Sequence, residues 1–252
     1  MDFSKLRVKD VHAVVHYKPT TTHWTAKDRH THIIGIKLSG TAPHDFGYTK
    51  FTLRPDCVFF FNQKDNYTVT DCSQDSESLS VHFTTYDEID TESFCIQLSS
   101  TKEFETILRK IKSAQNSGSD LLVYALQYRF LAELEQVHQK RYFKKDARIL
   151  AAKEFMDAHY TENNCLENAI LKSGITARHF TTLFGENFNT TPNRYITFKR
   201  MEYAKSLLLT GTLSVQEIAD LCGYTDIYYF SKVFKKEIGV SPSQWNTIFT
   251  KH

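Results

Sequence analysis

The chain has 252 residues, of which 41% are hydrophobic, and a formal net charge of +2. This suits a globular protein with two modest domains, and no apolar run approaches the roughly eighteen residues that cross a bilayer. The first ten residues lack the apolar segment of a signal peptide, so we expect a cytoplasmic protein without a membrane partner. The five cysteines are widely spaced and form no Cys-x-x-Cys pair, so neither a zinc knuckle nor a disulfide framework is indicated.

Charge is distributed unevenly along the chain. Residues 140–252 carry a net charge of +5, whereas the residues before them carry −3. A basic half fits a polyanionic partner such as a nucleic acid. The bias is mild, and it supports the motifs described below without replacing them.

Residues 1–98 are rich in β-branched and aromatic side chains and poor in helical periodicity. Short strands are predicted between turn signals such as Ser39-Gly40 and Arg54-Pro55-Asp56. The predicted strands cover residues 11–17, 31–38, 48–53, 57–61, 67–70 and 79–83. Several short strands at this spacing are typical of a small β-barrel or sandwich.

Two helices are predicted after the strands. Residues 101–114 place apolar side chains at i, i+3, i+4 and i+7, and residues 120–140 carry a broad apolar face. These helices either cover the open side of the β-structure or provide a dimer contact. Residues 139–145 are polar and basic and indicate a linker. The pattern therefore predicts an N-terminal domain over residues 1–140 and a C-terminal domain over residues 146–252.

The most specific pattern lies in residues 214–245. Ser214 can cap a short helix, Gly223 can end it in a left-handed turn, and Thr225 can cap a second helix. The apolar stripe predicted on that second helix consists of Tyr229, Phe230, Val233 and Phe234. This is the helix-turn-helix design, which offers its second helix to the DNA major groove. The alternative is a plain helical hairpin with a solvated basic face.

An internal repeat indicates a second copy of this module. The pairs separated by 50 residues are Phe180 and Phe230, Phe184 and Phe234, Pro192 and Pro242, and Tyr195 and Trp245. Thr176 can cap the recognition helix of the first module, which extends to about residue 187. The two motifs cover residues 164–188 and 214–238, and a long helix over residues 192–209 joins them.

Outward positions of the two recognition helices are the candidate DNA contacts. Arg178 can form two parallel hydrogen bonds to a guanine edge, and Thr181 and Thr182 offer a hydroxyl and a methyl. The candidates are Ala177, Arg178, His179, Thr181, Thr182, Asp226, Ile227, Tyr228, Ser231 and Lys232. Arg194 and Lys199 of the long helix are candidate phosphate contacts, and their alternative is ordinary solvated charge.

Residues 218–242 resemble the AraC/XylS family of bacterial transcription regulators. The matching residues are Ile218-Ala219, Gly223-Tyr224, Asp226, Tyr229-Phe230-Ser231, Phe234-Lys235-Lys236, Gly239 and Ser241-Pro242. The resemblance implies sequence-specific binding of double-stranded promoter DNA, a structural role for Arg200, and RNA polymerase as a candidate partner. The first copy departs from the pattern, because Ala169-Ile170 stands where the second copy has Ile218-Ala219.

A weaker resemblance is to the cupin-like effector domain of many AraC-type regulators. It rests on His30-Thr31-His32 and on the segment from Leu53 to Phe61. It implies an α+β protein, in which a cupin-like β-barrel or sandwich with two antiparallel helices precedes an all-α DNA-binding domain. It also implies a homodimer and a small-molecule effector. A polar cavity with His30 and His32 on its wall would suit a sugar or a small carboxylate. The candidate effector-binding residues are His30, His32, Phe46, Tyr48 and Phe61.

Metal-dependent cupins also use a His-x-His pair, and they need three histidines and a carboxylate. On a strand His30 and His32 would share a face, with His44 and His82 as possible further ligands. No glutamate follows His32 at the short spacing of metal cupins, so we expect no metal, no cofactor and no enzymatic activity. Two alternatives to a ligand-controlled regulator remain: a constitutive regulator whose N-terminal domain only dimerises, and a metal-dependent cupin enzyme fused to a DNA-binding module.

Overall fold

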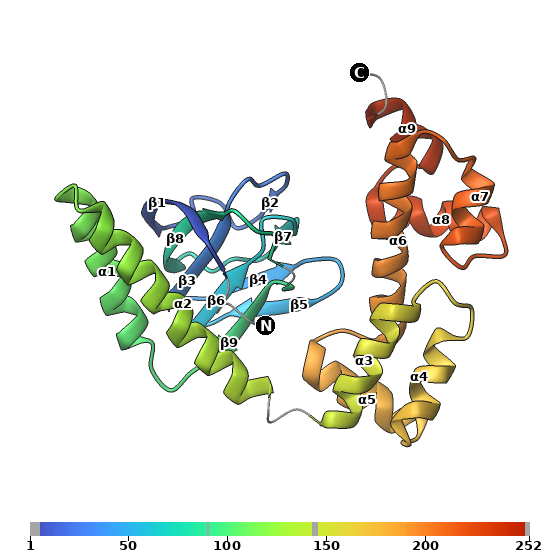
Figure 1. Ribbon diagram of the computed structural model, residues 1–252, viewed down its shortest axis with the longest axis horizontal. Coiled ribbons are helices and arrows are strands. Elements are labelled where there is room, and N and C mark those ends of the chain that lie inside the picture. Colours follow the sequence, from blue (N-terminus) through green and yellow to red (C-terminus); the bar gives the residue numbers. More distant parts are fainter. Residues whose placement is uncertain (1–5, 90, 143–145, 250–252) are drawn as a thin grey trace. The chain divides into compact units, whose positions relative to one another are not determined.

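The computed structural model describes residues 6–89, 91–142 and 146–249. The chain forms two compact units (Figure 1). The first comprises Met1–Phe46 with Lys50–Lys144, and the second comprises Gly47–Thr49 with Lys145–His252. Within the described residues, no helix combines the length and apolar character needed to cross a membrane.

The first unit contains two antiparallel sheets, which confirms the expected mixture of α and β structure. The five-stranded sheet has the order β1 (Val8–Tyr17), β8 (Glu77–Thr85), β3 (His32–Ser39), β6 (Cys57–Phe61), β9 (Phe94–Gln97). The four-stranded sheet has the order β2 (Trp24–Ala26), β7 (Tyr67–Val69), β4 (Ala42–Asp45), β5 (Lys50–Leu53). Strands β2, β4 and β9 were not predicted from the sequence.

Two helices cover one face of the five-stranded sheet (Figure 1). They are α1 (Lys102–Asn116) and α2 (Asp120–Tyr142). Because side chains alternate along a strand, Ile34, Val58 and Val81 all point to this side and pack with apolar residues of both helices. The opposite face of the sheet carries Phe59 and Phe61, whose rings pack with residues from the four-stranded sheet.

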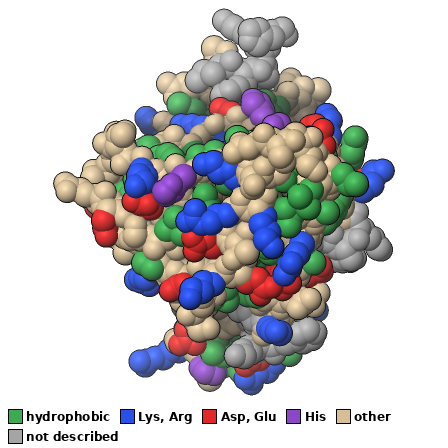
Figure 2. All heavy atoms as spheres, turned by 90° about the vertical axis from the view of Figure 1, so that its left-hand side faces the viewer, with side chains coloured by type: hydrophobic (Ala, Val, Ile, Leu, Met, Phe, Trp, Pro, Cys, Tyr) green, Lys and Arg blue, Asp and Glu red, His purple; other side chains and the backbone are tan. Residues whose placement is uncertain are grey.

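The outer surface of α1 and α2 mixes charged and apolar side chains. Figure 2 looks onto the side on which these helices lie and shows acidic and basic groups interspersed with hydrophobic ones. Arg129 pairs with Glu103 across the two helices, whereas Leu121, Leu122 and Tyr128 of α2 are exposed. One face of this helical pair is therefore buried against the sheet, and the other carries exposed apolar residues.

The second unit is helical and has two cores. Its helices are α3 (Ala147–His159), α4 (Cys165–Ser173), α5 (Ala177–Phe188), α6 (Pro192–Thr210), α7 (Val215–Leu221), α8 (Ile227–Ile238) and α9 (Pro242–Phe249). The first core joins α3, α4 and α5 to the beginning of α6. The second joins the later part of α6 to α7, α8 and α9. Helix α6 thus contributes to both cores.

The 50-residue repeat is visible as repeated ring geometry. The centroids of Phe180 and Phe184 are 5.8 Å apart, and those of Phe230 and Phe234 are 5.9 Å apart. The next aromatic contact is also repeated, at 5.8 Å between Phe184 and Tyr195 and at 6.2 Å between Phe234 and Trp245. All four phenylalanines are fully buried. The same aromatic core is therefore built twice.

Candidate nucleic-acid interface

Side-chain caps fix the beginning of the helices in both modules. The hydroxyl of Thr176 accepts a hydrogen bond from the backbone N–H of His179, as predicted for the start of α5. At α7, Ser214 Oγ accepts from Glu217 N, while Glu217 Oε2 accepts from Ser214 N at 2.8 Å. This reciprocal capping box satisfies backbone donors that the first turn of a helix leaves without partners.

The cap of α8 differs from the prediction. Asp226 rather than Thr225 occupies the N-cap, and its Oδ1 accepts from Tyr228 N at 2.7 Å and from Tyr229 N at 3.2 Å. A carboxylate is favoured there because it satisfies two N–H groups and faces the positive end of the helix dipole. Asp226, a candidate DNA contact, therefore has a capping role in the structure.

Each module places a glycine in the left-handed region at its turn, but the surroundings differ. Gly174 has φ +67°, and a Cβ there would meet nothing within 4 Å. Gly223 has φ +78°, and a Cβ there would lie 2.0 Å from the carbonyl oxygen of Thr161. Gly223 is therefore required both by its backbone conformation and by close packing against the loop between α3 and α4.

Helix α5 separates a buried face from an exposed face. Phe180 and Phe184 lie in the first core. The five candidate DNA contacts on this helix, Ala177, Arg178, His179, Thr181 and Thr182, are all exposed. Thr181 Oγ1 donates to Ala177 O at 2.9 Å and Thr182 Oγ1 donates to Arg178 O at 3.2 Å, so both hydroxyl protons are used within the helix. These threonines keep a hydroxyl lone pair and a methyl for an outside partner.

Helix α8 presents a different exposed surface. Tyr228 and Lys232 are exposed, and Ile227 and Ser231 are partly buried. The predicted apolar stripe was wrong at Tyr229, which is 59% exposed. Tyr224 occupies the inner position instead, with its ring 5.4 Å from Phe230. The sequence analysis therefore missed Tyr229, which adds a second exposed aromatic ring beside Tyr228.

Arg200 of α6 is a structural residue, as the resemblance implied. Its guanidinium donates to three backbone carbonyls: Nε to Tyr160 at 2.6 Å, Nη2 to Glu162 at 2.8 Å and Nη1 to Gly223 at 3.1 Å. The guanidinium also lies 5.2 Å from the ring centroid of Tyr224. Arg200 thereby joins the loop after α3 to the turn of the second module.

The two candidate phosphate contacts also lie on α6. Lys199 Nζ lies 3.2 Å from Asp157 Oδ1, so a carboxylate offsets its charge. Asp157 also accepts from Tyr195 Oη at 2.5 Å and from Lys153 Nζ at 2.9 Å. Burial alone would raise the pKa of Asp157, but Lys153, Tyr195 and Lys199 outweigh it and hold that pKa below its ordinary value. Arg194 lies in the first turn of α6, where its backbone N donates to Thr191 Oγ1.

Comparisons with known proteins identify a family model and relatives that are similar to this chain. A family model described as a helix-turn-helix domain matches residues 172–247. The chain is 27% identical over 139 residues to the lactose operon transcription activator of Staphylococcus xylosus, covering 54% of this chain and 50% of that protein. It is 30% identical over 136 residues to the raffinose operon transcriptional regulatory protein of Pediococcus pentosaceus, covering 50% of this chain and 47% of that protein. The helix-turn-helix region of this chain is therefore of the AraC/XylS type.

One solved structure similar to part of this chain is the C-terminal domain of AraT, a response regulator from Geobacillus stearothermophilus. The identity is 27% and the TM-score is 0.40, and the match covers 42% of this chain and 88% of that domain. The chain spans about half the length of the curated relatives it matches. The similarity to the AraC/XylS relatives therefore concerns part of each protein.

The histidine pair in the N-terminal unit is not arranged as expected. His30 is exposed and precedes β3, so the expectation that His30 and His32 share a strand face was wrong. His32 is buried on the helix-covered side, with its ring 5.3 Å from that of Phe83. Burial lowers the pKa of His32 to about 4, with Arg29 and Lys64 contributing, so its ring is neutral at pH 7. His32 is therefore a packed core histidine.

Three further candidate effector residues are aromatic. Phe46 and Phe61 lie 5.2 Å apart in a cluster between the sheets that also contains His44, Phe51 and Tyr67. Tyr48 belongs to the short segment Gly47–Thr49, which groups with the second unit. Burial lowers the pKa of His44 to about 4, so the cluster contains a neutral imidazole at pH 7. In the described part of the chain, no three His, Cys, Asp or Glu residues are grouped as metal ligands.

Proposed function

We propose that this protein is a DNA-binding transcription regulator that recognises promoter DNA with α5 and α8. One observation carries the proposal: the same aromatic core is built twice, and each copy buries one face of its recognition helix and exposes the other. Two such helices on one compact unit suit two segments of major groove. The names of the two relatives, an operon activator and an operon regulatory protein, support the same role.

The two recognition helices differ in what they offer to bases. Arg178 of α5 can hydrogen-bond in two places to a guanine edge, and the threonine methyls can contact thymine. Helix α8 offers the exposed ring of Tyr228, the apolar Ile227 and the charge of Lys232. We therefore assign base recognition to these residues. We assign contact with the DNA phosphates to Arg194. Lys199 contributes only weakly to this contact, because Asp157 offsets its charge.

We further propose that the N-terminal unit is a cupin-like domain that binds a small-molecule effector and forms a homodimer. The exposed Leu121, Leu122 and Tyr128 on α2 support the dimer contact, because a helical face with this much exposed apolar surface suits burial against a second copy. Sugar operons in the names of the relatives support control by an effector. Coupling between effector and DNA would then be reciprocal and worth about 1–3 kcal/mol. RNA polymerase is a further partner under this proposal.

The test uses the full chain. Binding sites are selected from a random pool of duplex DNA, and affinity for the selected site is measured by fluorescence anisotropy at several salt concentrations. We expect affinity to fall steeply with salt, because phosphate contacts release counterions. Arg178→Ala and Lys232→Ala should each cost about 1–3 kcal/mol and relax preference at one position.

Lys112→Ala is the control, because Lys112 is exposed on α1, which belongs to the other compact unit than the two recognition helices. Unchanged site preference in both Arg178→Ala and Lys232→Ala would contradict the assignment of these helices. Folded protein that selects no site and shows no salt-dependent binding would overturn the proposed function itself.

A further inference from the structure

A lysine is buried in the face of the five-stranded sheet that points away from the helices. Lys37 lies near the end of β3 and is 1% exposed. It pairs directly with Ser78 of β8, so the two side chains share a face. The neighbouring Ile36 points the other way, into the helix-covered core. Lys37 therefore places a basic group within the part of the fold where hydrophobic residues are expected.

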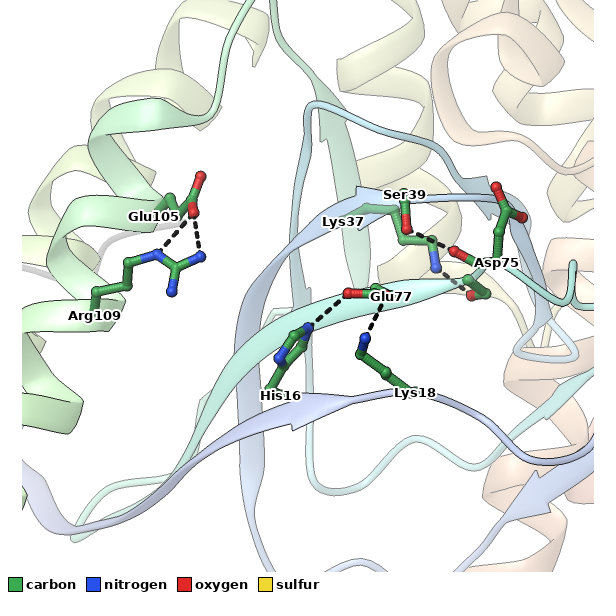
Figure 3. A network of polar contacts seen from close by, with 9 residues as sticks. His16, Lys18, Lys37, Ser39, Asp75, Glu77, Glu105 and Arg109 are labelled. Atoms are coloured by element: carbon green, nitrogen blue, oxygen red, sulfur yellow. Dashed lines mark hydrogen bonds and ion pairs between the residues drawn. The ribbon is translucent and has the colours of Figure 1, made fainter.

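The ammonium of Lys37 has little compensation from the protein. Its Nζ donates to Ser76 Oγ, and no carboxylate of the described residues lies within ion-pair distance of it (Figure 3). Glu77 is nearby, but its Oε2 lies 2.9 Å from His16 Nε2 and its Oε1 lies 2.7 Å from Lys18 Nζ (Figure 3). An ammonium has three donors, so two remain without a protein acceptor. A buried charge left in this state is costly.

Buried hydroxyls lie beside this ammonium. Ser78 and Ser80 are 9% and 5% exposed, and their register places Ser78 opposite Lys37 and Ser80 opposite Gly35. Within the described residues, neither hydroxyl makes a hydrogen bond. Buried polar groups in folded proteins nearly always have partners. A buried ammonium with a single acceptor, together with two serine hydroxyls on the same face, thus points to an external ligand.

These polar side chains lie at the corner of the sheet where β3 ends and β8 begins. Lys37 is two residues from the end of β3, and Ser76 immediately precedes β8. The chain beyond these ends includes Asp75, which is exposed, and Ser39, whose Oγ donates to the backbone oxygen of Asp75 at 2.6 Å (Figure 3). A group entering at this end of the sheet would meet the Lys37 ammonium and then the serines.

We propose that Lys37, with Ser78 and Ser80, binds the carboxylate of an acidic effector. This inference rests on the proposed function and decides between the two effector classes, a neutral sugar and a small carboxylate, in favour of the carboxylate. The carboxylate is the counter-ion of the Lys37 ammonium, and its oxygens accept hydrogen bonds from the ammonium and from the serine hydroxyls. A neutral sugar supplies hydroxyl acceptors but leaves the ammonium without a counter-ion.

The test compares acids with their neutral counterparts on the full chain. The probes are D-galacturonate against D-galactose and D-glucuronate against D-glucose, pairs that differ only in the carboxylate, with acetate as the bare group. Binding is measured by calorimetry and by the shift of the melting temperature. We expect at least one acid to bind and raise the melting temperature, with no response to its neutral counterpart.

Two variants and a control connect this response to the site. Lys37→Met retains the apolar stem and should weaken acid binding by about tenfold or more, because hydrogen bonds to charged groups contribute about 1.5–3 kcal/mol. Lys37→Met should fold at least as stably as the parent, since replacing a buried charge by an apolar side chain is often neutral or stabilising. Ser78→Ala should weaken binding less and keep the selectivity for acids. Lys102→Met, at an exposed position of α1, should leave binding unchanged.

Equal binding of acid and neutral sugar, acid binding unaffected by Lys37→Met, or no response to any of the acids would each overturn the proposal. DNA affinity measured on the same preparations separates this site from the proposed function. Acid binding without DNA binding would leave the Lys37 site standing and remove the regulator. DNA binding without acid binding would overturn the Lys37 site and leave the proposed regulator standing.

Discussion

The two helix-turn-helix modules have equivalent aromatic cores but differ in how their turns are held. The turn of the first module, at Gly174, has open space around it. The turn of the second, at Gly223, packs against Thr161, and the carbonyl oxygen of Gly223 accepts a hydrogen bond from Arg200. The caps differ in the same direction, since Asn164 makes no side-chain cap at α4 whereas Ser214 and Glu217 form a full capping box at α7. The turn of the second module is thus held by residues outside that module, Thr161 and Arg200, whereas the turn of the first module has open space around it.

This difference shows that a repeated sequence pattern specifies a core without specifying its restraints. The buried phenylalanines are equivalent in the two copies. The restraints come from residues outside the repeat, such as Arg200 of the connecting helix and Thr161 of the loop after α3. Substitutions at equivalent positions should therefore have unequal effects.

The largest difference is expected between the two turn glycines. In Gly223→Ala, the left-handed conformation and the displacement of the Thr161 backbone should together cost about 3 kcal/mol of unfolding free energy. In Gly174→Ala, only the left-handed conformation is penalised, at about 1 kcal/mol. Urea unfolding of both variants measures the difference. Equal losses would show that the contact of Gly223 with Thr161 does not restrain the second module.

The caps of the two recognition helices should differ by less. Asp226→Ala removes an acceptor for two backbone N–H groups and should cost about 1 kcal/mol, whereas Thr176→Ala removes one longer hydrogen bond and should cost about half as much. Asp226→Asn keeps a cap and should be nearly neutral. If Asp226→Asn instead changed the selected DNA sequence while stability stayed constant, Asp226 would be a base contact as well as a cap.

The smallest effect is expected in the pH dependence of the first module. Asp157 has a lowered pKa, so its stabilisation is complete above the ordinary carboxyl pKa of about 4 and is lost as the pH falls through the lower folded-state value. Asp157→Asn should cost at most about 1 kcal/mol at pH 7, because the carboxylate is a third exposed. The variant should also lose less stability than the parent below pH 4. Parallel acid unfolding curves for the two proteins would contradict this role.

The helix ends of the second module were predictable because their signals are local. Ser214 begins a helix and Gly223 ends it for reasons of backbone chemistry that any such sequence shows. Thr225 and Asp226 are both good caps, however, and the choice between them depends on which one aligns with two N–H groups at once. The exposure of Tyr229 was missed because Tyr224, outside the helix, fills the core position first.

The β-structure was less predictable because its signals are non-local. Strand β4 contains Pro43, and proline argues against a strand because it lacks an N–H donor. The structure tolerates it because the carbonyl of Pro43 still accepts from Thr70 N on the β7 side. Lys37 was missed for a related reason, since a lysine in the run Ile-Gly-Ile-Lys-Leu is expected to reach solvent, and only the register with Ser78 shows that it does not.

The three carbonyl contacts of Arg200 also have a consequence on DNA. They join the loop after α3 to the turn before α8, so the connecting helix does not act alone as a hinge between the modules. The orientation of one recognition helix relative to the other is then restrained. Under the proposed function, a promoter must match that orientation, and inserting half a helical turn, about five base pairs, between its two half-sites turns one of them to the far side of the duplex. Promoters recognised in this way should therefore vary in sequence more freely than in the phasing of their half-sites.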